Sequence, residues 1–177
     1  MSMVPGPDPP ELNAAAIIMV LNEHDVRYLV MGAFAAIAQQ APIPATRDID
    51  VTPEAGSENL GRLSAALKHL GARIRSETVP EGLAFDHGAS SIASAHMWNL
   101  VCPYGELDVS FRPSGFEGGY IELSAHAHVV RVDGVEVVIA DLNDVIRSKE
   151  AAGRPKDLRV LPLLYRHRAT QRGGSGV

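Results

Sequence analysis

The stretch 46–51, Thr-Arg-Asp-Ile-Asp-Val, places two carboxylates two positions apart in what reads as a β-strand. Side chains at positions i and i+2 of a strand point to the same face, so Asp48 and Asp50 share one face while Ile49 and Val51 face a core. Two adjacent carboxylates repel each other, and burial increases that repulsion. A divalent cation that prefers oxygen ligands, Mg²⁺ or Mn²⁺, relieves it. A solvated strand edge is the alternative, and the spacing alone does not separate the two.

The composition fits one globular domain with room for a small helical appendage: the chain has 177 residues, 46% of them apolar and 21% charged. No run of about eighteen apolar residues is present, so we expect no membrane span. Residues 1–10 lack the basic and apolar segments of a secretory signal. The single cysteine, Cys102, excludes an internal disulfide and fits a reducing compartment. We therefore expect a cytoplasmic protein.

Charge is unevenly distributed along the chain, whose formal net charge is −5. Between Asp141 and Arg172 there are eight Lys and Arg against four Asp and Glu, whereas the rest of the chain carries eight against seventeen. The overall balance argues against a generally basic nucleic-acid binder. A basic C-terminal segment behind an acidic body can nevertheless guide a polyanion toward a metal-loaded acidic site. A solvated helix surface would have the same composition.

Apolar periodicity and the positions of Gly and Pro divide the chain into helices and strands. Helices are expected over residues 11–24, 33–40, 57–70, 141–152 and 155–167, with Pro162 kinking or interrupting the last one. Strands are expected over residues 27–31, 46–51, 73–75, 96–102, 106–111, 129–132 and 136–139. Residues 78–95 are expected to form a loop that has room for one helical turn.

Two further features accompany the Asp-x-Asp pair. Gly32 follows a strand and opens a helix, where free backbone N–H groups and the helix dipole favour a phosphate. Asp108 lies on the polar face of strand 106–111, in which polar and apolar residues alternate. A third carboxylate could complete a two-metal site and activate an attacking hydroxyl. The sequence contains no Walker-type, Rossmann, zinc-ligand or Gly-x-Ser-x-Gly motif.

Five segments in this order resemble the nucleotidyltransferase superfamily with the polymerase-β-type palm, and in particular its toxin–antitoxin branch of AbiEii- and MenT-type toxins. They are residues 28–36 (Tyr-Leu-Val-Met-Gly-Ala-Phe-Ala-Ala), 46–50 (Thr-Arg-Asp-Ile-Asp), 104–109 (Tyr-Gly-Glu-Leu-Asp-Val), 135–142 (Val-Glu-Val-Val-Ile-Ala-Asp-Leu) and 147–157 (Arg-Ser-Lys-Glu-Ala-Ala-Gly-Arg-Pro-Lys-Asp). The Asp-x-Asp segment alone is a weak signal, whereas the ordered set is specific. The resemblance covers roughly residues 12–167.

The resemblance implies an α+β fold, a nucleotidyltransferase-type mixed sheet flanked by helices, with a small C-terminal helical part. The expected divisions are a disordered N-terminus over residues 1–10, a nucleotidyltransferase core over 11–140, C-terminal helices over 141–168 that pack on the core, and a flexible tail over 169–177.

The resemblance also implies a set of catalytic residues. Asp48 and Asp50 correspond to the metal-binding pair, and Asp108 corresponds to a third strand carboxylate that also binds metal. Lys149 and Asp157 correspond to a catalytic lysine and aspartate in the C-terminal helices. A lysine at that point can offset triphosphate charge, although an exposed salt bridge to Asp157 is the structural alternative. Asp157 also fits a dipole-favoured acid in the first turn of a helix.

The nucleotide-binding residues implied by the resemblance are Gly32, Ala33, Arg47 and Lys149. Ala33 departs from the family pattern, which usually has a second glycine or a serine at this position, so a hydroxyl donor to the phosphates is missing while the backbone N–H remains. Arg47 fits a phosphate contact and equally fits a charge partner for the two neighbouring acids.

These residues lead us to expect a Mg²⁺-dependent enzyme, with Mn²⁺ as the alternative ion, that uses a nucleoside triphosphate. By resemblance, the acceptor is the 3′ end of tRNA, so that the protein is a growth-arresting toxin with a cognate antitoxin as partner. One alternative is a protein or small-molecule acceptor, as in AMP-transferring antitoxins and aminoglycoside-modifying enzymes. The other is an inactive palm that serves as a binding module, to which Ala33 gives slight support and the three carboxylates do not.

Overall fold

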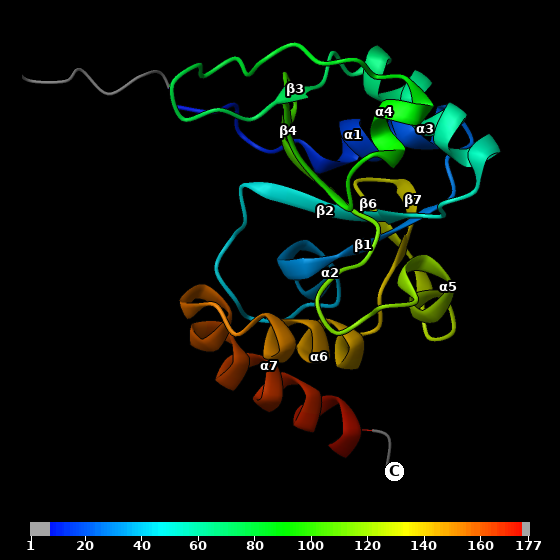
Figure 1. The fold of residues 1–177 in the computed structure, drawn as a ribbon. Helices are drawn as coiled ribbons and strands as arrows, with labels where there is room; N and C mark the ends of the chain where they lie inside the picture. The colour runs from blue at the N-terminus through cyan, green and yellow to red at the C-terminus, as the bar shows by residue number, and fades with distance from the viewer. Residues whose placement is uncertain (1–7, 175–177) are drawn as a thin grey trace, which may run out of the picture.

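The computed structural model describes residues 8–174, which form one seven-stranded mixed sheet with helices on both faces (Figure 1). The strands are β1 Tyr28–Met31, β2 Asp48–Pro53, β3 Arg73–Ile74, β4 Met97–Cys102, β5 Gly105–Ser110, β6 His128–Val132 and β7 Val135–Ile139. The helices are α1 Ala14–Glu23, α2 Gly32–Ala38, α3 Ser57–His69, α4 Ala89–Ala93, α5 Gly119–Ser124, α6 Leu142–Ala152 and α7 Pro155–Gly173.

The strand order β3-β4-β5-β2-β1-β7-β6 places β2 in the middle of the sheet. Strand β2 runs antiparallel to β1 and parallel to β5, and hairpins join β4 to β5 and β6 to β7. The register sets Asp50 of β2 beside Asp108 of β5, although 58 positions separate them in the chain. The sheet topology therefore brings together carboxylates that the sequence keeps far apart.

Helices α1, α3 and α4 cover one face of the sheet, and α2, α6 and α7 cover the other (Figure 1). The first group packs against the apolar side of the central strands, where Ile49, Val51, Leu107 and Val109 are fully or almost fully buried. Alternation along β2 and β5 then directs their polar side chains to the opposite face. This is the face on which α2, α6 and the start of α7 lie.

Local sequence signals explain the ends of several helices. The Asp141 side chain accepts a hydrogen bond from the Asn143 N–H at 2.8 Å and begins α6, which ends at Gly153 with φ 60°. Asn13 caps α1 in the same way by accepting from the Ala16 N–H. These caps satisfy backbone groups that a helix end leaves without an intrahelical partner.

The structure confirms the α+β class and the mixed sheet flanked by helices. Helix α5 is absent from the sequence-based expectation because six residues are too few to show helical periodicity. Helix α7 continues through Pro162 to Gly173, beyond the expected end at residue 167, so the proline does not terminate it. Of the expected disordered N-terminus and flexible tail, residues 1–7 and 175–177 lie outside the described part of the chain.

Among residues 8–174, no helix combines the length and apolar character needed to cross a membrane.

Candidate active site

Three carboxylates meet on the polar face of the sheet. Asp48 and Asp50 extend from β2 and Asp108 from the neighbouring β5, and one oxygen of each lies within 4.8 Å of the others. Asp108 is buried, and the other two are partly buried. Alternation along β2 puts the first pair on one face, and the parallel pairing of β2 with β5 adds the third.

The carboxylates raise one another's affinity for protons. Burial, followed by the charges of Asp48 and Asp108, raises the pKa of Asp50 to about 7, against a partial offset from Lys149 and Lys156. Burial likewise raises the pKa of Asp108 to about 6, with Arg75 opposing the shift. The charge of this cluster is therefore incompletely neutralised by the protein's own cations.

The cluster fits a hard divalent cation. Several carboxylate oxygens within one small volume form the ligand set that Mg²⁺ and Mn²⁺ prefer. Such a cation would also remove the mutual repulsion that raises the pKa of Asp50. Asp48, Asp50 and Asp108 are thus suited by residue type and by spacing to hold a metal ion, the identity of which this donor set leaves between magnesium and manganese.

Gly32 allows Asp50 to lie against the start of α2. Its φ of +67° is a left-handed value, and a Cβ at this position would lie 2.1 Å from the Oδ2 atom of Asp50. Any side chain would therefore displace the carboxylate as well as strain the backbone. Gly32 and Ala33 are the first two residues of α2, and the contact of Gly32 with Asp50 places this helix start next to the cluster.

Thr46 and Arg47, the two residues before Asp48, differ in their contacts with the acidic pair. The Thr46 hydroxyl donates a hydrogen bond to the Oδ1 atom of Asp48 at 2.7 Å and so fixes that carboxylate. Arg47 is exposed and forms no ion pair with any residue between 8 and 174. Arg47 is therefore not the charge partner of the acidic pair in this conformation.

Lys149 and Asp157 form an ion pair at the junction of α6 and α7, with 3.4 Å between Nζ and Oδ1. Asp157 is fully buried, and its Oδ2 also accepts from Arg154 Nε at 2.7 Å and from the Arg154 backbone N–H at 3.3 Å. Despite the opposing effect of burial, these bonds and the Lys149 charge hold the pKa of Asp157 below its ordinary value. Asp157 lies outside the carboxylate cluster and orients the two cations.

Sequence reasoning missed two cations of the site, Arg75 and Lys156. The Nη2 atom of Arg75 donates to the Oδ1 atom of Asp108 at 2.9 Å, and the charge of Lys156 lowers the pKa of Asp50. Lys156 belongs to the segment 147–157 that carried the family resemblance, so a signal for it was present. Arg75 had no local signal, because only the strand order β3-β4-β5 brings its side chain across β4 to Asp108.

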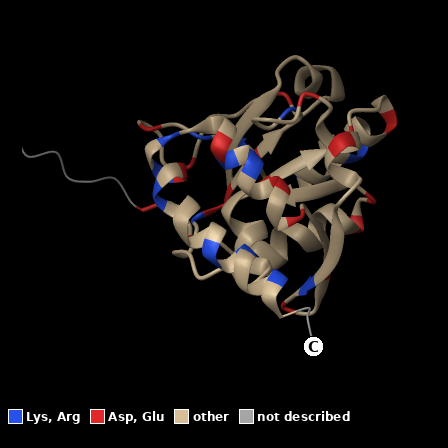
Figure 2. Ribbon diagram, turned by 90° about the horizontal axis from the view of Figure 1, so that it is seen from below, with Lys and Arg blue, Asp and Glu red and all other residues tan. Residues whose placement is uncertain are grey.

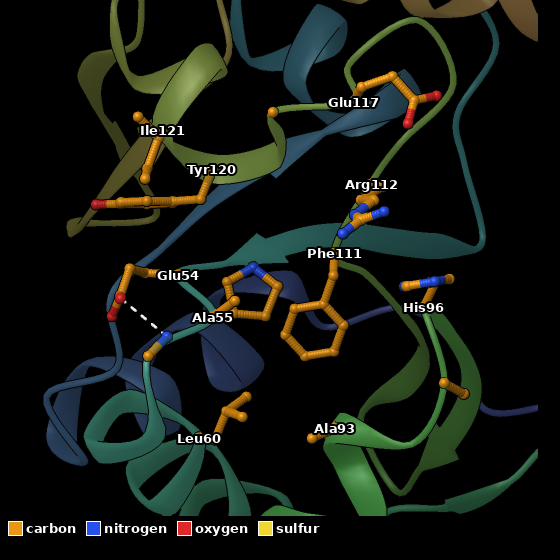
Figure 3. Close-up of a pocket in the computed structure, with 14 residues that line it drawn as sticks. Glu54, Ala55, Leu60, Ala93, His96, Phe111, Arg112, Glu117, Tyr120 and Ile121 are labelled. Carbon is orange, nitrogen blue, oxygen red and sulfur yellow. Dashed lines mark hydrogen bonds between the residues drawn. The ribbon is translucent and has the colours of Figure 1, made fainter.

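A pocket of about 480 Å³ opens at the other end of β2, about 16 Å from Asp48 by strand rise. Leu60, Phe111 and Tyr120 form apolar walls, with Glu54, Arg112 and Glu117 at its edges (Figure 3). The pocket contains none of the predicted site residues and does not belong to the carboxylate cluster.

Two solved structures share this architecture. A Thermotoga maritima protein assigned as a nucleotidyltransferase superposes with a TM-score of 0.53 at 14% sequence identity, over 86% of this chain and 89% of that one. ANT(2″)-Ia in complex with adenylyl-2″-tobramycin superposes with a TM-score of 0.53 at 18% identity, over 88% of this chain and 87% of that one. No family model and no curated protein matches the sequence.

These similarities show that the chain shares its fold with two nucleotidyltransferase structures. They do not extend the resemblance to the AbiEii- and MenT-type toxins, since neither structure is described as one.

Proposed function

We propose that this chain is a metal-dependent nucleotidyltransferase, which transfers a nucleoside monophosphate from a nucleoside triphosphate to an acceptor hydroxyl. The observation that carries this proposal is the cluster of Asp48, Asp50 and Asp108 on a sheet of the nucleotidyltransferase type. A fold alone does not define an activity. Here the three carboxylates are suited to hold a divalent ion, and all three belong to the segments that carry the sequence resemblance. Together with the fold, these observations support the proposed activity.

Each carboxylate has a distinct part in this proposal. Asp48, held by Thr46, and Asp50, held against Gly32, bind the ion. A bound divalent cation offsets phosphate charge and acidifies a nearby hydroxyl. Asp108 keeps its Oδ2 atom outside the hydrogen bond that Arg75 makes to Oδ1. This free oxygen can accept the proton of the acceptor hydroxyl.

The reaction balances with these groups. The acceptor oxygen forms a bond to the α-phosphorus of the nucleotide while the bond from that phosphorus to the bridging oxygen breaks, and pyrophosphate leaves with the electron pair. The proton of the acceptor hydroxyl passes to Asp108. Lys149 and Lys156, whose charges already act on Asp50, offset the charge of the triphosphate.

For the acceptor we propose the 3′ end of tRNA, and for the biological role a cytoplasmic toxin restrained by an antitoxin. The support is the family resemblance and the basic C-terminal segment. Helix α7 carries five Lys and Arg against the single acid Asp157, which is buried. Figure 2 views the molecule from the side of α6 and α7 and shows Lys and Arg positions on helices nearest the viewer. A basic surface of this kind attracts a phosphate backbone.

A small-molecule acceptor is the second candidate, because one structural neighbour is in complex with adenylyl-2″-tobramycin, an adenylylated aminoglycoside. An aminoglycoside is polycationic, so it favours acidic surroundings rather than the basic helix α7. The carboxylate chemistry is the same for both acceptors, and they differ only in the surface beyond the cluster.

The experiment supplies each of the four α-labelled nucleoside triphosphates with Mg²⁺ to total tRNA, and in parallel to a set of aminoglycosides. We expect label on the 3′ end of tRNA with wild-type protein, and a loss of about 10²-fold or more for Asp48→Asn. Asp133→Asn, in the turn between β6 and β7, is the matched control and should label normally. Label on an aminoglycoside selects the second candidate. No label on any acceptor contradicts the enzymatic proposal and favours an inactive palm that serves as a binding module.

A further inference from the structure

Arg75 lies in one row with Asp108 and Asp50 across the sheet. It directly follows β3, and its backbone N–H donates to the Asn99 carbonyl of β4 at 2.9 Å. Asn99 is paired with Asp108 of β5, which is paired in turn with Asp50 of β2. The side chain of Arg75 thus reaches the cluster from the sheet edge, on the side away from α2.

The guanidinium is held by charge more than by a full set of hydrogen bonds. Its Nη2 atom donates to Asp108 Oδ1 at 2.9 Å and to the Leu100 carbonyl at 3.2 Å. Its Nε atom lies 3.6 Å from Glu106 Oε1. That Nε is buried and has no hydrogen-bond partner among the described residues. A buried donor without a partner is unfavourable, so the guanidinium is incompletely satisfied in this position.

A guanidinium on the Oδ1 atom of Asp108 leaves Oδ2 free, but its charge weakens the binding of a divalent cation to the same carboxylate. Both seek the oxygen lone pairs of Asp108, and two positive groups within a few ångströms repel. Asp48 and Asp50 have no arginine partner among the described residues and stay available. Of the three carboxylates, Arg75 therefore pairs with Asp108 alone and leaves Asp48 and Asp50 without an arginine partner among the described residues.

We propose that Arg75 is a positioning residue that competes with divalent cations for Asp108 and limits the resting site to one ion, bound by Asp48 and Asp50. This inference rests on the proposed function only in taking the cluster to be a metal site. A second ion on Asp108 binds weakly while the guanidinium stays on Oδ1, because the two positive groups repel. Arg75 thus controls how many ions the site holds.

The test is a Mn²⁺ titration of the full chain, with free Mn²⁺ measured by electron paramagnetic resonance. We expect one tightly bound ion per wild-type chain. In Arg75→Gln, a second ion should bind at least about tenfold more tightly than in wild type, the equivalent of a lost charge-assisted hydrogen bond. Arg75→Lys keeps the positive charge and should keep the wild-type stoichiometry. Arg73→Gln is the matched control on the same strand, since its Nε contacts the Gly82 carbonyl instead.

Asp108→Asn provides an independent variant in case Arg75→Gln folds poorly. It should still bind one ion, because Asp48 and Asp50 remain, and it should bind no second ion. Loss of the first ion in Asp108→Asn, or identical titrations of wild type and Arg75→Gln, would overturn the inference. Absence of Mn²⁺ binding in every protein would overturn both the inference and the proposed metal site. The expected titrations without any nucleotidyl transfer would overturn the proposed function alone.

Discussion

The contact between Gly32 and Asp50 is the tightest constraint on the candidate site at the scale of single residues. The glycine has a left-handed φ and no space for a Cβ, because the carboxylate oxygen occupies it. The carboxylate in turn has its pKa raised to about 7 by burial and by two neighbouring acids. Backbone conformation, packing and charge thus all depend on the contact between Gly32 and Asp50, and different substitutions test each of them.

Gly32→Ala should destabilise the fold and weaken metal binding together. Its matched control is Gly71→Ala, since Gly71 has a similar φ of +62° but nothing within 4 Å of an added Cβ. We expect about 1 kcal/mol of lost stability for Gly71→Ala from backbone strain alone. Gly32→Ala should lose about 1–3 kcal/mol more, because it also displaces Asp50. Urea denaturation and Mn²⁺ titration measure both effects, and equal results for the two variants would contradict the contact.

Asp50→Asn should stabilise the metal-free protein at alkaline pH. The folded-state pKa of about 7 exceeds the ordinary value of 3.8, so the folded state binds this proton more tightly than the unfolded state. Protonation therefore supports the fold fully below about pH 4, and this support is lost as the pH rises through about 7. Since asparagine stays neutral, the variant should gain stability over wild type across that interval, by about 1–3 kcal/mol above pH 7.

Unfolding in the presence of a chelator, at several pH values between about 4 and 8, measures this difference. Added Mg²⁺ should stabilise wild type and leave Asp50→Asn unchanged. Asp133→Asn removes an acidic charge remote from the cluster and should show no such gain. A variant that is less stable than wild type at every pH would show that Asp50 is not under repulsion.

At the scale of elements, the junction of α6 and α7 positions the cations of the site. Gly153 ends α6, Pro155 begins α7, and the buried Asp157 binds both Lys149 and Arg154 across the turn between them. Pro at the first position of a helix removes an N–H that has no partner there anyway. The Asp157 carboxylate therefore ties α6 to the start of α7 through its contacts with Lys149 and Arg154.

Asp157→Ala should destabilise the protein more than Lys149→Ala. Removing the buried carboxylate leaves two cations without their partner, and such a loss is worth about 3 kcal/mol or more. Removing Lys149 leaves Asp157 bound to Arg154, so about 1 kcal/mol is expected. Chemical denaturation of both single variants and the double variant measures the difference and the coupling. A larger effect for Lys149→Ala would contradict the role assigned to Asp157.

At the scale of the whole molecule, acidic side chains gather on the polar face of the sheet and basic side chains on the last helix, α7. The cluster is acidic, while α7 carries basic side chains along its exposed length, among them Arg159 and Arg166. An acidic metal site next to a basic surface suits an acceptor whose backbone is a polyanion. A polycationic aminoglycoside would gain no binding affinity from the basic helix α7. Substitutions in this helix therefore distinguish the two acceptors experimentally.

Replacing both Arg159 and Arg166 by Ala should weaken tRNA binding and reduce the slope of log affinity against log salt by about 2. Arg62→Ala on α3, which covers the opposite face of the sheet, should leave the slope unchanged. Filter binding of labelled tRNA over a series of salt concentrations measures the slope. A slope that does not change in the double variant would remove α7 from the acceptor surface.

The sequence by itself determined the alternation that places Asp48 and Asp50 on one strand face, the glycine at the start of α2, and most helix and strand positions. These follow from periods of two and of 3.6 residues and from local caps, which any stretch of chain expresses without its neighbours. Short or proline-containing elements such as α5 and the end of α7 were missed because local signals were weak or misleading.

Only the tertiary structure decided what meets across strands. The parallel pairing of β2 with β5 brings Asp108 to Asp50, and the position of β3 at the edge brings Arg75 to Asp108. Strand order depends on how the whole apolar surface is buried, and no local segment encodes it. For the same reason the sequence suggested the third carboxylate, Asp108, but not Arg75, which forms an ion pair with it.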